Sequence, residues 1–148
     1  MKLIVFYFTL YLKVLFNFYM KFNKPYLIVA LILLITEIAI ALFVDDSFVR
    51  PIGGDFLVVI LLYATVRGVS GFGSFSVLIG VLLFSYLIEF LQYLDFVTRL
   101  GLEDVQIARV VLGTYFSWID VIAYTAGALF VLIVETKLKP IVSKWNTL

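Results

Sequence analysis

The sequence contains no cysteine and no histidine among its 148 residues. Their absence excludes disulfide bonds, thiol chemistry, zinc sites built from Cys and His, and a Ser-His-Asp catalytic triad. Charged residues are also scarce, at 14% of the chain, against about 25% in a typical soluble domain. Hydrophobic residues make up 64%, and the mean hydropathy is +1.16. This composition predicts an integral membrane protein with no separate soluble domain.

Four apolar runs are candidates to cross the ~30 Å hydrocarbon core of a bilayer as helices. They cover residues 25–44, 56–66, 75–94 and 118–134. The second run is short, but residues 53–55 and 67–68 on its flanks extend it. Tyr115 and Trp118 are typical of an aromatic anchor at the membrane interface. The runs predict an all-α membrane protein built as a four-helix transmembrane bundle.

The basic residues are unevenly distributed around these four runs. Those before the first run, after the second and after the fourth are Lys2, Lys13, Lys21, Lys24, Arg67, Lys137, Lys139 and Lys144. The other two connections and their flanks are richer in Asp and Glu. The positive-inside rule then places both termini and the 67–74 loop in the cytoplasm, and the acidic connections outside.

The first 24 residues have the pattern of an amphipathic helix lying in the inner membrane interface. Six polar residues fall on one arc of such a helix: Lys2, Thr9, Lys13, Asn17, Lys21 and Lys24. A fifth span is the alternative, although it would leave Lys13 and Asn17 at bilayer depth. We therefore divide the chain into an N-terminal amphipathic extension at 1–24, a four-span membrane domain at 25–135 and a cytoplasmic tail at 136–148.

A short helix is also predicted between the third and fourth spans, on the outer surface. Glu103 and Asp104 suit its N-terminus, and Gly113 suits the position just after its C-terminus. Apolar residues recur between them at helical spacing. Arg109 would lie on the membrane-facing side of this helix, where its guanidinium can reach the acidic ends of the spans.

Glu89 is the most informative residue, because an ionisable side chain at bilayer depth costs at least ~2.5 kcal/mol and rarely faces lipid. Gln92 shares its helix face at i+3. Further charged residues fall near the same membrane surface. We interpret the set as an outward-facing polar pocket and candidate ligand-binding site, with a structural ion-pair network as the alternative: Arg50, Asp55, Glu89, Gln92, Arg109 and Asp120.

Glu37 lies inside the first apolar run and raises the same question. We expect it to be hydrogen-bonded to a neighbour such as Tyr63, Thr65 or Tyr86, in either a structural or a functional role. The adjacent carboxylates at 45–46 offer too few oxygen ligands for calcium. No metal site is expected.

Two pairs of small residues recur at i, i+4 within the spans: Ser76 with Gly80, and Ala123 with Gly127. Such pairs allow two helices to approach closely in a membrane. We expect them to serve packing inside the bundle rather than dimerisation.

Residues 37–59 resemble the first half of a small bacterial membrane family of unknown function, which carries a Glu in the first span followed by Phe-x-Arg-Pro-x-x-Gly-Asp. The second half resembles VanZ-like proteins, with Glu89, Gln92, Arg109, Asp120 and Gly127 at the corresponding positions. Tyr124 stands where VanZ-like proteins usually have Asn. The resemblance implies a bacterial inner-membrane protein with a role in the cell envelope. The VanZ name is associated with resistance to teicoplanin, a lipid-bearing glycopeptide.

The leading hypothesis is a non-enzymatic envelope protein that binds an amphiphilic molecule from the outer leaflet. Candidate partners are a membrane lipid, a lipid-linked envelope precursor or a lipoglycopeptide, whose head would lie at the polar pocket. One alternative is a membrane enzyme with Glu89 and Asp120 as acid and base. Another is a small, proton-coupled transporter that uses Glu37 and Glu89. No cofactor and no nucleic-acid partner are expected.

Overall fold

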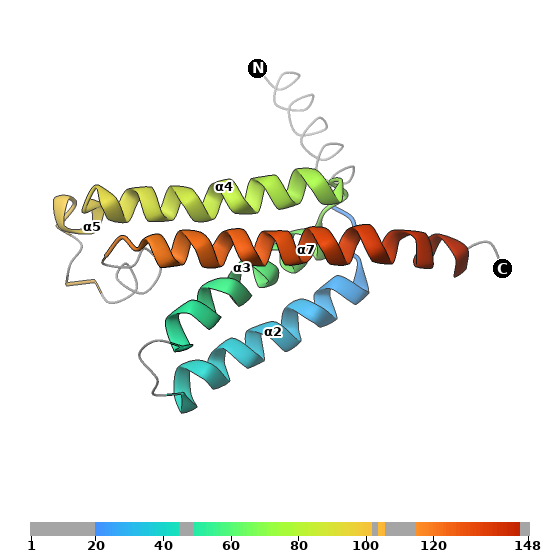
Figure 1. The fold of residues 1–148 in the computed structure, drawn as a ribbon, viewed down its shortest axis with the longest axis horizontal. Coiled ribbons are helices and arrows are strands. Elements are labelled where there is room, and N and C mark those ends of the chain that lie inside the picture. Colours follow the sequence, from blue (N-terminus) through green and yellow to red (C-terminus); the bar gives the residue numbers. More distant parts are fainter. Residues whose placement is uncertain (1–19, 45–48, 102–103, 106–114, 146–148) are drawn as a thin grey trace, which may run out of the picture.

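The structure, a computed structural model, describes residues 20–44, 49–101, 104–105 and 115–145, with side chains placed at 20–44, 52–101, 104–105 and 115–137. The helices in these segments are α2 (Lys24–Phe43), α3 (Val49–Val69), α4 (Ser74–Tyr93), α5 (Phe96–Arg99) and α7 (Trp118–Trp145). Four of them are long and apolar enough to cross a membrane. The predicted all-α, four-helix membrane bundle is confirmed (Figure 1).

The helix bounds follow the apolar runs closely for α2 and α4, which each begin and end one residue before the prediction. Helix α3 begins at Val49, seven residues before its apolar run. Pro51 does not prevent this, because the first turn of a helix does not need its N–H. Helix α7 continues to Trp145, so residues 136–145 of the predicted tail extend the last helix. Residues 1–19 of the predicted N-terminal helix lie outside the described residues, and residues 20–23 are not helical. Most of the predicted outer helix, including Arg109, also lies outside the described residues.

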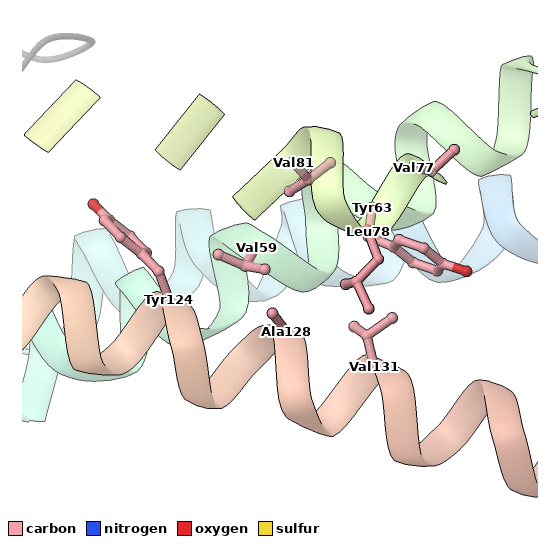
Figure 2. Close-up of a cluster of buried hydrophobic side chains, with 8 residues drawn as sticks. All are labelled: Val59, Tyr63, Val77, Leu78, Val81, Tyr124, Ala128 and Val131. Atoms are coloured by element: carbon pink, nitrogen blue, oxygen red, sulfur yellow. The ribbon is translucent and has the colours of Figure 1, made fainter. Parts of the chain in front are cut away.

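Helix α3 is the centre of the bundle and packs against α2, α4 and α7. Helix α4 also packs against α7, and the two run side by side in Figure 1. Their shared core is a cluster of buried side chains, shown in Figure 2: Val59, Tyr63, Val77, Leu78, Val81, Tyr124, Ala128 and Val131. Helix α2 buries only Ala30. Its other apolar side chains are largely exposed, as expected for a helix that faces lipid.

Gly127 permits the close approach of α7 to α3. A Cβ atom there would lie 2.7 Å from the Phe56 carbonyl oxygen and 3.3 Å from the Val59 Cβ. Ala123, one turn earlier, is also buried. These contacts agree with the packing role predicted for Ala123 and Gly127. Ser76 and Gly80 differ, because both are exposed and a Cβ at Gly80 would meet nothing within 4 Å.

The two ends of the bundle carry opposite charges. The end where α2 starts and α3 turns into α4 holds Lys21, Lys24, Arg67 and Lys137, and we name it the basic end. Here the chain before α2 is hydrogen-bonded to the end of α3, from Lys21 N to Val69 O at 3.2 Å and from Asn23 N to Gly68 O at 2.8 Å. The opposite end, where α7 starts, holds Asp55, Glu89 and Asp120 and is named the acidic end.

Candidate functional site

Glu89 is the most deeply buried charged side chain among the placed residues, with 2% of its surface exposed. Its two carboxylate oxygens have different donors. The Tyr124 hydroxyl donates to Oε1 at 3.2 Å, and the Ser117 backbone N–H donates to Oε2 at 3.2 Å. Ser117 immediately precedes α7, where backbone N–H groups have no partner within the helix. The start of α7 therefore supplies a donor to this buried carboxylate.

Tyr124 joins Glu89 on α4 to Asp55 on α3. Its hydroxyl lies 3.1 Å from Asp55 Oδ1 as well as 3.2 Å from Glu89 Oε1. Since a phenol carries a single proton, the two acidic side chains compete for one donor. Figure 2 shows the Tyr124 hydroxyl pointing away from the core cluster, in the direction opposite to that of Tyr63.

Asp120 completes the group, because it interacts electrostatically with both Asp55 and Glu89. We name Asp55, Glu89, Asp120 and Tyr124 the carboxylate cluster. It is drawn from α3, α4 and α7, and none of the placed Lys or Arg side chains forms a salt bridge with it. Three acidic groups close together in apolar surroundings favour bound protons or a bound cation. The carboxylate cluster can therefore accept hydrogen bonds and bind a positively charged group.

The other predicted pocket residues are placed less completely. Gln92 is half-buried, and its side chain makes no hydrogen bond to a described residue. Arg50 lies in the first turn of α3, with its side chain outside the described set. Arg109 lies wholly outside it. Of the six predicted pocket residues, the structure therefore brings together the three carboxylates Asp55, Glu89 and Asp120.

Glu37 has a different environment from the one predicted. Its Oε2 atom lies 3.6 Å from the position of a Cβ at Gly54, and its Oε1 atom is buried without a hydrogen bond. Two of the three expected partners are engaged elsewhere, since Thr65 donates to Leu61 O and Tyr86 bonds to Thr125. The third, Tyr63, has its hydroxyl beside Glu135 at the basic end. None of the three named partners therefore bonds to Glu37 within the described residues, because α2 packs this carboxylate against the start of α3.

The sequence analysis missed a second polar cluster at the basic end. The Tyr26 hydroxyl donates to Glu135 Oε1, and Tyr63 and Ser74 lie close to the same carboxylate. The Arg67 guanidinium lies 5.2 Å from the centre of the Tyr26 ring. We name these five residues the basic-end cluster. Glu135 ends the last apolar run and was interpreted only as its boundary.

Tyr124 and Ser117 were missed as site residues too. Tyr124 entered the analysis only as a departure from the Asn of VanZ-like proteins. A usable signal exists, because Asp120 and Tyr124 are four residues apart and share a face of one helix. Ser117 also binds its own helix, since its hydroxyl accepts the Ile119 N–H at 3.2 Å.

Within the described segments, no group of three or more Asp or Glu side chains is arranged to hold a metal ion. Comparison with protein families gives one match: the model of a family described as "Protein of unknown function (DUF2809)" matches residues 44–128, more than half of the chain. No curated protein matches the chain. No solved structure matches it.

Proposed function

We propose that this chain, which belongs to the DUF2809 family of unknown function, binds an amphiphilic molecule in the membrane through a polar head at the carboxylate cluster. The single observation behind the proposal is the sharing of one phenol proton between Asp55 and Glu89, with Asp120 nearby. These acidic groups offer more acceptors than the described residues supply with donors. A ligand that brings N–H or O–H groups would complete them.

The charge of the cluster favours a particular class of head group. A protonated amine brings both hydrogen-bond donors and a compensating positive charge. Sugar hydroxyls bring donors alone. We therefore propose an amine-bearing or hydroxyl-rich amphiphile, such as an aminophospholipid or a lipoglycopeptide. Its chain would lie along the apolar outer faces of the helices.

Kinship with VanZ-like proteins is part of the proposal. It is supported by the five matching positions in the second half of the chain. Three of them have a physical reason here: Glu89 and Asp120 belong to the carboxylate cluster, and Gly127 permits the contact between α3 and α7. Fold-level kinship carries no function by itself.

We also propose a place in the bacterial inner membrane, with both termini in the cytoplasm and the acidic end outside. The basic residues at one end support this orientation. Cysteine introduced at Glu103 should react with an impermeant reagent in intact cells, whereas cysteine at Lys144 should react only after the membrane is opened. The reverse labelling pattern would place the carboxylate cluster on the cytoplasmic side.

Binding can be tested with purified protein in nanodiscs, by titrating labelled phosphatidylethanolamine against labelled phosphatidylglycerol. The wild-type chain should prefer the amine-bearing lipid, and Asp55→Asn and Asp120→Asn should each weaken that preference several-fold. Glu37→Gln is the matched control, because it neutralises a carboxylate in a span outside the cluster. Equal losses in all three variants, or no preference in the wild type, would contradict the proposal.

A further inference from the structure

An apolar groove runs between α3 and α4 in the half of the bundle next to the basic end. Its volume is about 550 Å³, which is within the roughly 300–1,000 Å³ range of ligand pockets. Its lining is almost entirely apolar and comes from both helices and the turn that joins them: Leu62, Val66, Phe72, Ser76, Val77, Gly80, Val81 and Phe84. The groove is open along one side, and Gly80 leaves its middle free of side chains.

The basic end of this groove carries hydrogen-bond donors and a net positive charge, since Lys21, Lys24 and Arg67 outnumber the one nearby carboxylate, Glu135. Arg67 donates to the backbone carbonyl of Phe72, which places its guanidinium beside the turn that lines the groove. The Arg67 Nε atom and the Ser70 hydroxyl are buried and have no hydrogen-bond partner among the described residues, and Ser70 is 9% exposed. Helix α4 starts here after Gly73 with no side-chain cap, so its first N–H groups add donors of the kind that bind phosphate.

We propose that this groove binds a phospholipid with an anionic head from the leaflet at the basic end. One acyl chain lies in the groove, and the phosphate lies at the turn near Arg67 and the start of α4. Lys21 and Lys24, both exposed at the same end, add positive charge around the head group. The site is separate from the carboxylate cluster at the acidic end and does not rest on the function proposed for it.

A second copy of the chain is a weaker occupant on electrostatic grounds. Two chains in one membrane share the same orientation, so a symmetric contact through this groove would bring basic end against basic end. Like charges placed together oppose such a contact. An anionic head group reverses the sign of that interaction.

The test is native mass spectrometry of the full chain in detergent, with added phosphatidylglycerol or phosphatidylcholine. Gly80→Leu should fill the groove, since a Cβ there meets nothing within 4 Å. Gly53→Leu is the matched control, because Gly53 is equally open but lies outside the groove. We expect Gly80→Leu to weaken phosphatidylglycerol binding at least tenfold, and Gly53→Leu to leave it unchanged.

A second pair of variants tests the head group. Arg67→Gln should lower the preference for phosphatidylglycerol over phosphatidylcholine several-fold, and Arg67→Lys should retain most of it. Inorganic phosphate should not compete, because it has no chain to occupy the groove. The proposal is overturned if Gly80→Leu binds lipid like the wild type. It is also overturned if Gly80→Leu lowers dimer content or thermal stability without a loss of lipid, because another chain or residues 1–19 would then be the occupant.

Discussion

The two ends of this bundle use the same pair of residue types in opposite arrangement. At the acidic end, α3 contributes the acid and α7 the tyrosine, as Asp55 and Tyr124. At the basic end, α3 contributes a tyrosine and α7 the acid, as Tyr63 and Glu135, which lie close together. The hydrogen bond to Glu135 there comes from Tyr26 of α2, and the described residues give the Tyr63 hydroxyl no hydrogen bond of its own. Between them lie the aliphatic side chains of the core, with the two hydroxyls pointing to opposite ends (Figure 2).

The difference between the ends is their charge balance. The basic-end cluster sets one carboxylate, Glu135, against one guanidinium, Arg67, and gives it a tyrosine donor as well. Among the residues with placed side chains, the carboxylate cluster sets three acidic side chains against one phenol and one backbone N–H. At the basic end the buried carboxylate already has its donors and a positive partner, whereas at the acidic end the described residues leave the carboxylates short of both. This contrast is the reason for assigning the ligand to the acidic end.

The largest loss of stability is expected at Gly127, because the contact between α3 and α7 there supports the clusters at both ends. Gly127→Val would place side-chain atoms where the Phe56 carbonyl already lies 2.7 Å from a Cβ, and so would separate α3 from α7. Overpacking of this kind costs about 3 kcal/mol or more when two methyl groups are added. Gly80→Val, in open space, is the control and should be near neutral. Thermal unfolding in detergent measures both, and equal stability of the two variants would contradict the close contact.

Glu135→Gln against Asp55→Asn tests the difference in charge balance directly. Loss of the Glu135 charge removes the partner of Arg67 and weakens the bond from Tyr26, so we expect a loss of about 1–3 kcal/mol in stability. Asp55→Asn relieves repulsion among carboxylates and still accepts from Tyr124. It should leave thermal stability unchanged or raise it. Losses of the same size in both variants would remove the distinction between the ends.

Arg109, whose guanidinium we expect to reach the acidic ends of the spans, would supply a positive charge to the acidic end if it pairs with Glu89. A double-mutant cycle of Glu89→Gln and Arg109→Met should show a coupling of about 1 kcal/mol in thermal stability, with the double variant better than the sum of the single losses. Additive losses would mean that Arg109 does not contact Glu89. The acidic end would then depend on a ligand alone for positive charge.

The smallest effect is expected at Glu37, which belongs to neither cluster. Glu37→Gln keeps the shape of the side chain and removes no hydrogen bond to a described residue, so it should change stability by less than about 0.5 kcal/mol. Thermal unfolding beside Glu135→Gln provides the measurement. A large loss would show that the carboxylate has a partner beyond the described residues.

The spans were predictable from the sequence because each one is an apolar run, and a bilayer requires its backbone groups to be satisfied within a helix. This is why the ends of α2 and α4 agree with the prediction to within one residue. The length of α3 was underestimated because Arg50, Pro51 and Asp55 interrupt the apolar pattern before residue 56. Those residues are helical nonetheless, because side-chain polarity at a helix end does not prevent its backbone hydrogen bonds.

The polar contacts could be predicted only in part. Asp55, Glu89 and Asp120 stand out as acids near one membrane surface. Tyr124 does not, because tyrosine is common in apolar spans and its hydroxyl has value only once two other helices place acids beside it. Glu37 shows the converse: its charge is obvious, but its neighbour Gly54 depends on how α2 packs against α3. Helix pairing is information that no local pattern contains.

The hydrogen bonds between the chain before α2 and the end of α3 have a consequence for biosynthesis. Lys21 and Asn23 are translated long before Val69 and Gly68, whose carbonyl groups accept their N–H groups. The close contact between the end of α3 and the start of α2 also favours glycine at position 68, since a Cβ there would lie 2.6 Å from the Leu27 side chain. The hydrogen bonds at the start of α2 can therefore form only after the ribosome has synthesised all of α3. Membrane insertion of α2 and completion of its hydrogen bonds are separate events in time.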